Sequence, residues 1–199
     1  MNETIDYYSE HSEQFARRYE KIKPQAVHAA WKHLLPDTKS KILDVGAGSG
    51  RDAGWLAGRG HNVVAVEPAD NLRKKAIGLH PHDAIHWVND RLPDLKEVHR
   101  LEQVFDVILV SAVWMHLARS DRSGAFDSVY RLLDQAGIMM ISFRKGTAAD
   151  RPAMYPVTGD EIRALARQYG LEVVINIRND DLYNRTEVHW ETFVLKHRI

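Results

Sequence analysis

The sequence contains no cysteine. Disulfide bonds, a thiolate nucleophile and cysteine metal ligands are therefore excluded, and such a chain suits a reducing compartment. An excess of either charge is also absent, because 27 Lys and Arg residues balance 27 Asp and Glu residues. Proteins that hold long nucleic acids carry a basic excess, and binding to acidic membranes needs one too. We therefore expect neither nucleic acid nor membrane as a partner.

Long hydrophobic runs are absent as well. The richest apolar stretch, Val104 to Leu117, contains Asp106 and His116 and is too short to span a bilayer. The N-terminal residues lack the basic and then apolar pattern of a signal peptide. We therefore expect a cytoplasmic protein. A length of 199 residues with 44% hydrophobic content favours one globular domain with a full core.

Short β-branched runs alternate with helical segments in the middle of the chain. Such alternation predicts βαβ units and a parallel sheet with right-handed crossovers. Strands are expected over residues 41–45, 62–66, 84–88, 105–110 and 137–143, and helices over 51–58, 69–79 and 120–133.

The two ends of the chain differ from this pattern. Two helices, over residues 4–21 and 24–35, are expected before the first strand, with Pro24 in a first helical turn. A helix over 158–169 is expected after the core, capped by Thr158 with Glu161 three residues on. The last two strand-like runs, 171–177 and 187–196, leave no room for a helix between them, so they predict an antiparallel hairpin.

The most informative segment is the glycine-rich stretch DVGAGSGRD, which runs from Asp44 to Asp52 and leaves a strand to enter a helix. Residues without side chains let the backbone turn sharply and approach a ligand closely. Glu67 ends the next strand, about 20 residues after Gly46, where an acid can accept both hydroxyls of a ribose. The segment therefore indicates a nucleotide-containing ligand.

Two classes of cofactor use this arrangement. Dinucleotide folds have the pattern G-x-G-x-x-G, but Arg51 occupies the position of the third glycine here. Asp44 at the strand end would repel a pyrophosphate and suits a cationic ligand, such as an ammonium or a sulfonium. An NAD-dependent oxidoreductase is thus the less favoured alternative.

On these features the sequence resembles the class I S-adenosylmethionine-dependent methyltransferases, among them the small single-domain members of methyltransferase types 11 and 12. The resemblance implies an α/β fold, a Rossmann-like three-layer sandwich. Its seven-stranded, mostly parallel sheet would have the order 3-2-1-4-5-7-6, with the last strand antiparallel and helices on both faces. The matching places are residues 44–50, Glu67, Asn89 with Asp90, the strand over 105–110 with the residues just after it, and 133–143 with Gly137.

The same resemblance implies one methyltransferase domain over residues 1–199. Residues 1–36 would be helices that cap the cofactor site, 41–143 the nucleotide-binding core, and 158–199 a helix with the closing hairpin. The implied cofactor is S-adenosyl-L-methionine, with S-adenosyl-L-homocysteine as product. A module that binds these molecules without catalysis is an alternative.

By resemblance, the glycine loop would line the methionine part of the cofactor, with Asp44 near its ammonium group and Arg51 near its carboxylate. Glu67 would hold the ribose, Asp90 would accept from the adenine amino group, and Arg91 would lie beside the ring. Tyr8, with Arg17 and Tyr19 on the same helix, would close over the site. The candidate cofactor-binding residues are Tyr8, Asp44, Gly46, Ala47, Gly48, Arg51, Glu67, Pro68, Asn89, Asp90, Arg91, Ser111 and Ala112.

Each of these residues also has a purely structural alternative. The glycines can serve only as a turn, and Glu67 as a solvated strand end. Asp90 can be a turn residue before Leu92-Pro93, Arg51 can pair with a surface acid, and the tyrosines can anchor helices by packing.

His116 is the candidate catalytic base, because it follows the fourth strand on the side where ligands bind and titrates near neutrality. Its structural alternative is a histidine at a helix start. Methyltransferases that act on nucleobase amino groups typically carry Asn/Asp-Pro-Pro-aromatic here, whereas this chain has SAVW, so a small-molecule substrate is favoured. Candidate substrate contacts are Trp114, Met115, Arg144 and Tyr155, together with Lys145 and Tyr183. Trp114 and Met115 can instead cap the core, and the other four can be surface residues.

The histidine-rich segment from His80 to His86 is the only dense group of metal-binding side chains. Metal ligands must converge and need supporting residues, and nothing else in the chain completes a site. We therefore expect no metal. The pattern leaves open the methyl acceptor, the atom that is methylated, and whether the protein is a monomer or a homodimer.

Overall fold

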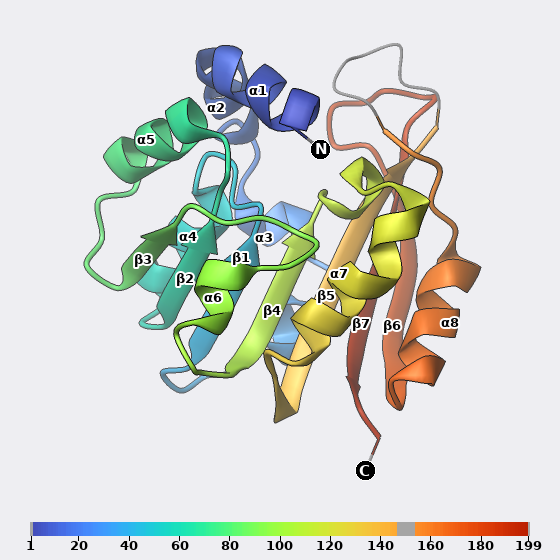
Figure 1. Cartoon of the computed structure of the whole chain (residues 1–199). Coiled ribbons are helices and arrows are strands. Elements are labelled where there is room, and N and C mark those ends of the chain that lie inside the picture. Colours follow the sequence, from blue (N-terminus) through green and yellow to red (C-terminus); the bar gives the residue numbers. More distant parts are fainter. Residues whose placement is uncertain (1, 147–153, 199) are drawn as a thin grey trace.

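The structure, a computed structural model, describes residues 2–146 and 154–198 (Figure 1). Seven strands form one sheet in the order β3-β2-β1-β4-β5-β7-β6. Only β7 runs antiparallel to its neighbours β5 and β6, and the other pairs are parallel. The predicted fold and strand order are confirmed. The strands are β1 (Lys41–Val45), β2 (Asn62–Val66), β3 (Ile85–Val88), β4 (Phe105–Ser111), β5 (Leu133–Lys145), β6 (Leu171–Asp180) and β7 (His189–His197).

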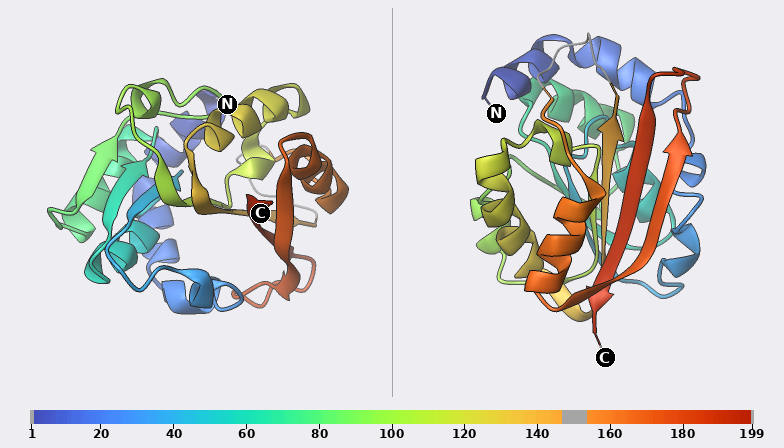
Figure 2. Two further views of the ribbon diagram at one scale, coloured as in Figure 1. Left: turned by 90° about the horizontal axis from the view of Figure 1, so that it is seen from below. Right: turned by 90° about the vertical axis from the view of Figure 1, so that its right-hand side faces the viewer.

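Helices cover both faces of this sheet (Figure 2). α6 (Lys96–His99), α7 (Arg122–Tyr130) and α8 (Gly159–Gln168) pack on one face, and α4 (Arg51–Gly58) packs on the other. Val107 to Val110 of β4 are therefore completely buried, as expected for an apolar run covered on both faces. This arrangement is the three-layer sandwich that the sequence predicts.

The helices expected over 51–58 and 69–79 agree with the structure within one residue, but the helix expected over 120–133 is shorter, since α7 ends at Tyr130 and Leu133 already begins β5. The Thr158 side chain accepts a hydrogen bond from the Glu161 amide at 3.3 Å, which confirms the predicted cap of α8. β5 is longer than the expected 137–143 at both ends, because Leu133 pairs with Phe105 of β4 and because Arg144 and Lys145 pair with the start of β7. The four-residue helix α6 was not expected from the sequence.

The N-terminal helices are shorter than the sequence predicts. The helix expected over 4–21 is two helices, α1 (Asn2–Glu10) and α2 (Ser12–Tyr19), because His11 leaves helical geometry. The helix expected over 24–35 begins at Pro24, as predicted, but α3 ends at Val27 and only the short 3-10 helix η1 (Lys32–Leu34) follows.

The turn after α3 is held together by buried side chains. The Trp31 indole donates to His28 Nδ1 at 3.2 Å, so His28 Nε2 carries the hydrogen and faces Asp52 at 2.9 Å. Both His28 and Trp31 are almost fully buried.

The helices α1 and α2 lie beside α5 (Asp70–Leu79), across the top of the molecule as drawn in Figure 1. Phe15 and Ala16 pack with Ala69 and Leu72 in a small separate core. No helix within residues 2–146 and 154–198 is long and apolar enough to cross a membrane.

Candidate functional site

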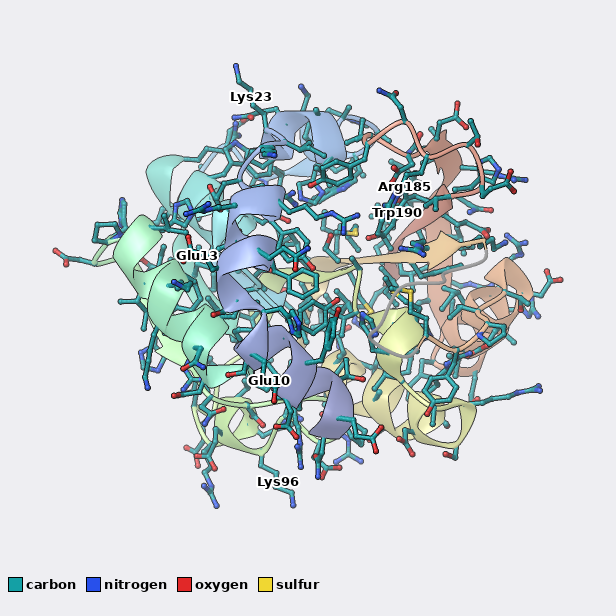
Figure 3. All side chains as sticks on the ribbon, turned by 90° about the horizontal axis from the view of Figure 1, so that it is seen from above. Glu10, Glu13, Lys23, Lys96, Arg185 and Trp190 are labelled. Atoms are coloured by element: carbon teal, nitrogen blue, oxygen red, sulfur yellow. The ribbon has the colours of Figure 1, made fainter. Side chains whose placement is uncertain are left out.

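A cavity of about 550 Å³ opens at the carboxyl ends of the parallel strands, beneath α1 and α2 (Figure 3). Val45, Val66 and Ser111 line it at the ends of β1, β2 and β4. Open α/β sheets bind ligands at this edge, and small-molecule sites have volumes of about 300–1,000 Å³. The cavity is therefore the candidate site, in the predicted place.

The glycine loop forms the floor of this cavity. The amides of Gly46 and Ala47 both donate to the Val66 carbonyl at 2.8 Å, which fixes the loop on β2. Gly46 has a φ of +73°, and a Cβ there would lie 2.3 Å from Cγ2 of Val113. Glycine is thus required both for the backbone conformation and for the close approach to the segment after β4.

Glu67 lies at the end of β2 with only 6% of its surface exposed. Its Oε2 accepts from the Gly48 amide and its Oε1 from the Ala69 amide, both at 2.8 Å. Burial raises the pKa of this carboxyl to about 7, against the opposing effect of those two hydrogen bonds. The side chain is therefore no solvated strand end: it lines the cavity beside the loop.

Asp44 is the second buried acid of the cavity and is 2% exposed. Its Oδ2 has no hydrogen-bond partner among the residues that the structure describes. Burial, followed by the nearby charge of Asp52, raises the pKa of its carboxyl well above the usual range. A buried acceptor without a partner is costly, so the site is suited to a ligand that brings a donor or a positive charge.

Arg51 lines the cavity but is held by an acid of the chain itself. Its Nε lies 2.8 Å from Oδ1 of Asp52, and its Nη2 lies 3.1 Å from Oδ2. Asp52 is buried, so the partner is not the surface acid considered from the sequence. Burial acts to raise the pKa of Asp52, but its interactions with His28 and Arg51 outweigh this and lower it.

Asp90 and Arg91 line the far part of the cavity, whereas Asn89 is exposed and does not. The Asp90 carboxylate accepts from the backbone amides of Arg91, Glu97 and Val98 at 2.7–3.0 Å, so it orders the turn before α6. The Arg91 guanidinium donates to Asn2 of α1 at 2.6 Å. Asp90 therefore has the structural role of a turn residue, and its contact with adenine stays a prediction.

The segment after β4 borders the cavity with Ser111, Ala112, Met115 and His116. Trp114 does not border it: this side chain is fully buried and packs edge-on against Phe126, with ring centroids 6.2 Å apart. The proposed substrate contact of Trp114 is thus wrong, because its side chain points into the core between the sheet and α7.

The remaining substrate candidates fall into two groups. Arg144 and Tyr183 line the cavity. Tyr155 is 43% exposed and lies outside it, and Lys145 is paired with Glu191. Pro68 lines the cavity beside Glu67, as expected.

His116 ends the 3-10 helix η2 (Trp114–His116) and is buried. Its Nε2 lies 3.2 Å from the Tyr8 hydroxyl, and the two rings meet edge to face at 5.6 Å. Burial raises the pKa of Tyr8 to about 12, so this hydroxyl stays protonated at neutral pH. The first helix thus reaches the candidate base through Tyr8.

Arg17 is the arginine that the sequence predicts on the covering helix, but Arg18 is the one that lines the cavity. Arg17 is 77% exposed and pairs with Glu13 on the surface. Arg18 follows Phe15 by three residues, so both lie on the inner face of α2, as does Tyr19. Arg17, two residues after Phe15, falls on the opposite, outer face of a helix, and this signal was present in the sequence.

The loop between β6 and β7 forms a wall of the cavity, whereas the sequence predicts only a short polar turn there. Asp181 is buried there and accepts from Nε and Nη2 of Arg185 at 2.8 Å and from the Trp190 indole at 2.9 Å. Burial acts to raise the pKa of Asp181, but the hydrogen bonds from Arg185 and Trp190 outweigh it and lower it. Arg185 and Trp190 lie close together in Figure 3 and line the cavity.

Metal-binding side chains do not gather anywhere in the described part of the chain: no group of three or more His, Asp or Glu residues there has the required geometry. His80, from the histidine-rich segment, lies 3.1 Å from Glu20 at the end of α2.

The chain matches the family model described as "Methyltransferase domain" over residues 43–141. It is 25% identical over 139 residues to an uncharacterized methyltransferase of Bacillus pumilus, covering 68% of this chain and 58% of the relative. It is 29% identical over 119 residues to an uncharacterized methyltransferase of Mycobacterium tuberculosis, covering 60% of this chain and 46% of the relative. The chain thus spans about half the length of the curated relatives that it matches.

Solved structures resemble the whole fold. A TehB-like SAM-dependent methyltransferase from Corynebacterium glutamicum superposes with a TM-score of 0.64 at 25% identity, covering 94% of this chain and 98% of the other. A 1,6-didemethyltoxoflavin-N1-methyltransferase from Burkholderia thailandensis, solved with S-adenosylhomocysteine, gives a TM-score of 0.69 at 19% identity, covering 98% and 87%. At that identity the second likeness concerns the fold alone.

Proposed function

This chain belongs to the class I S-adenosylmethionine-dependent methyltransferases, and from that premise we propose that it transfers a methyl group from S-adenosylmethionine to a small-molecule nucleophile by in-line displacement. S-adenosylhomocysteine is then the product. The observation that carries the proposal is the position of Glu67, buried beside the Gly48 amide in the same cavity as Asp44, whose Oδ2 has no partner in the described part of the chain.

The residues present fit this cofactor. Glu67 keeps unused lone pairs on both carboxylate oxygens, which suits two ribose hydroxyls. Oδ2 of Asp44 lacks a partner among the described residues, which suits the ammonium group of a methionine moiety. The loop at Gly46 and Gly48 has no side chain on the cavity floor, so the backbone itself can contact the ligand.

When bound, S-adenosylmethionine supplies an activated methyl group on a positively charged sulfur. The task of the chain is then to align the acceptor with that group and to exclude water. Tyr8 and Tyr19 of α1 and α2 cover the cavity, and Ser111 with Ala112 form its wall at the end of β4. These residues would hold the two reactants in a line.

A nucleophile that must lose a proton needs a base, and His116 Nε2 is placed to accept it. The Tyr8 hydroxyl lies within hydrogen-bond distance of this nitrogen, at 3.2 Å. The methyl acceptor would therefore either displace the Tyr8 hydroxyl or pass its proton to His116 through that hydroxyl. Asp44 and Glu67 are unsuitable as bases toward the acceptor, because we assign both to the cofactor.

The proposed substrate is a small molecule because the chain has balanced charge and the cavity holds about 550 Å³. Long nucleic acids need a basic surface, and large acceptors need an open edge rather than a covered cavity. α1 and α2 cover this one.

Calorimetric titration with S-adenosylmethionine and S-adenosylhomocysteine tests the proposal. We expect both to bind, and Glu67→Ala to weaken the binding by about 1.5–3 kcal/mol, the range for charge-assisted hydrogen bonds. Glu172→Ala, which removes a half-exposed carboxylate on β6, is the matched control and leaves the affinity unchanged. No binding of either molecule at high micromolar concentration would contradict the proposal.

A further inference from the structure

The wall that α2 and the β6–β7 loop form around the cavity carries an arginine that the proposed function does not yet use. The guanidinium carbon of Arg18 lies 4.9 Å from the centroid of the Tyr183 ring. The Tyr183 hydroxyl donates to the Arg18 carbonyl at 2.6 Å. The loop is therefore fastened to the end of α2, and the Arg18 side chain is held over an aromatic ring at the edge of the cavity.

The charge of Arg18 differs from that of the other arginines nearby. Arg51 is paired with Asp52, and Arg185 is paired with Asp181. Arg18 forms no ion pair with any carboxylate of residues 2–146 and 154–198. A half-buried guanidinium on a cavity wall without an acidic partner is a binding group for an anion.

The surroundings of Arg18 define the rest of such a ligand. Met115, Met154 and Trp190 line the cavity with apolar surface, and the bond from Trp190 to Asp181 fixes the orientation of its ring. Tyr8 and Arg144 line the same cavity as Arg18. Tyr8 in turn lies against His116.

We propose that the methyl acceptor is a carboxylate with an apolar body, and that Arg18 binds its carboxylate group. The inference rests on the proposed function and names the substrate class of the same cavity. A guanidinium accepts a carboxylate through two parallel hydrogen bonds, and stacking on Tyr183 orders it beforehand. An acceptor held there extends along Met115 and Trp190, with its other end toward His116.

The cofactor has a carboxylate of its own, so the experiment must separate the two sources. The variants are Arg18→Gln and Arg17→Gln; the second removes an exposed arginine from the neighbouring position of the same helix. Calorimetry first measures the affinity of each for S-adenosylhomocysteine. We expect the wild type and the two variants to bind S-adenosylhomocysteine with dissociation constants that agree within about twofold. A loss of tenfold or more in Arg18→Gln alone would assign Arg18 to the cofactor and overturn the inference.

The second arm uses protein saturated with S-adenosylhomocysteine and matched pairs of probes: 4-hydroxybenzoate with 4-hydroxybenzamide, and anthranilate with 2-aminobenzamide. We expect the carboxylates to bind about tenfold to a hundredfold more tightly than the amides in the wild type and in Arg17→Gln. Arg18→Gln removes that preference. Absence of a carboxylate preference in both pairs overturns the inference.

Two further results distinguish a failure of the proposed function from a failure of the inference about Arg18. If the wild type does not bind S-adenosylhomocysteine, the proposed function itself fails in the first arm. If Arg18→Gln does not fold, Arg18→Lys replaces it: this variant keeps the charge and loses the planar fork, so we expect a reduced preference for carboxylates. An unchanged preference in Arg18→Lys, together with unchanged binding of S-adenosylhomocysteine, would overturn the role of the guanidinium.

Discussion

The two walls of the cavity are built from very different stretches of sequence. In the wall formed by β1, β2 and the glycine loop, the bond from Gly48 to Glu67 joins residues 19 positions apart. In the wall formed by α1, α2 and the β6–β7 loop, the contacts of Tyr8 with His116 and of Tyr183 with Arg18 span 108 and 165 positions. The first wall is a local motif, whereas the second exists only after the chain has folded.

The largest effect is expected from a substitution in the glycine loop of the first wall. Gly46→Val places a side chain 2.3 Å from Val113 at a φ of +73°, so strain and overpacking combine. We expect the free energy of unfolding to fall by about 2–5 kcal/mol and cofactor binding to be lost. Chemical denaturation and calorimetry measure the two effects.

Gly58→Ala is the control for that substitution. Gly58 ends α4, and a Cβ there would meet no atom within 4 Å. Alanine should leave stability unchanged or raise it by up to about 1 kcal/mol. Equal stability of Gly46→Val and Gly58→Ala would show that the loop does not need its close approach.

The next largest effect is expected from a substitution in the β6–β7 loop of the second wall. Asp181→Asn removes the charge that holds Arg185 and weakens the bond to Trp190. We expect a loss of about 2–3 kcal/mol in the free energy of unfolding, since one partner of a buried pair is lost. Asp180→Asn, at an adjacent side chain that is 99% exposed, should cost less than about 0.5 kcal/mol. Equal losses would mean that the loop is not organised by Asp181.

The third prediction sharpens the role of Glu67 through pH. The pKa of this acid is raised in the folded state to about 7, from an ordinary value of 4.5. The protonated form is therefore favoured on folding, so the stability it contributes is full below pH 4.5 and is lost as pH rises to about 7. Glu67→Gln should flatten this part of the stability curve.

Cofactor binding should have the opposite dependence on pH. Ribose hydroxyls donate to the ionised carboxylate, so the affinity for S-adenosylhomocysteine should increase by up to about tenfold per pH unit below pH 7 and level off above it. Titrations at pH 5.5, 6.5 and 8 measure the trend. A wild-type affinity with the same pH dependence as Glu67→Gln would contradict the placement of the ribose.

The smallest effect concerns the link between the two parts of the second wall. Tyr183→Phe removes the hydroxyl that donates to the Arg18 carbonyl but keeps the ring beneath the guanidinium. We expect a loss of about 1 kcal/mol in the free energy of unfolding. Tyr155→Phe, at an exposed ring outside the cavity, should change nothing, and an equal loss there would show that the hydroxyl of Tyr183 does not fasten the loop to α2.

The sequence predicted the first wall because its chemistry lies in residue types at fixed spacing. Gly46 needs a positive φ, and Glu67 must end the strand after the loop, so both positions can be recognised without coordinates. The strand order follows from the alternation of strands and helices together with the family resemblance. Trp114 was misjudged because a segment after a strand has no periodicity that separates a core side from a cavity side.

The second wall could not be predicted in the same way. The inner face of α2 is set by its packing on α5, where Phe15 and Ala16 contact Ala69 and Leu72, and this packing brings Arg18 to the cavity. This outcome depends on contacts between distant segments, and local spacing does not encode them.

A crystal structure of the protein with S-adenosylhomocysteine tests the central claim most directly. The account predicts the adenosyl group in the cavity above the glycine loop, with both ribose hydroxyls within hydrogen-bond distance of Glu67. A bound molecule elsewhere, with the Glu67 carboxylate still engaged only by Gly48 and Ala69, would contradict it.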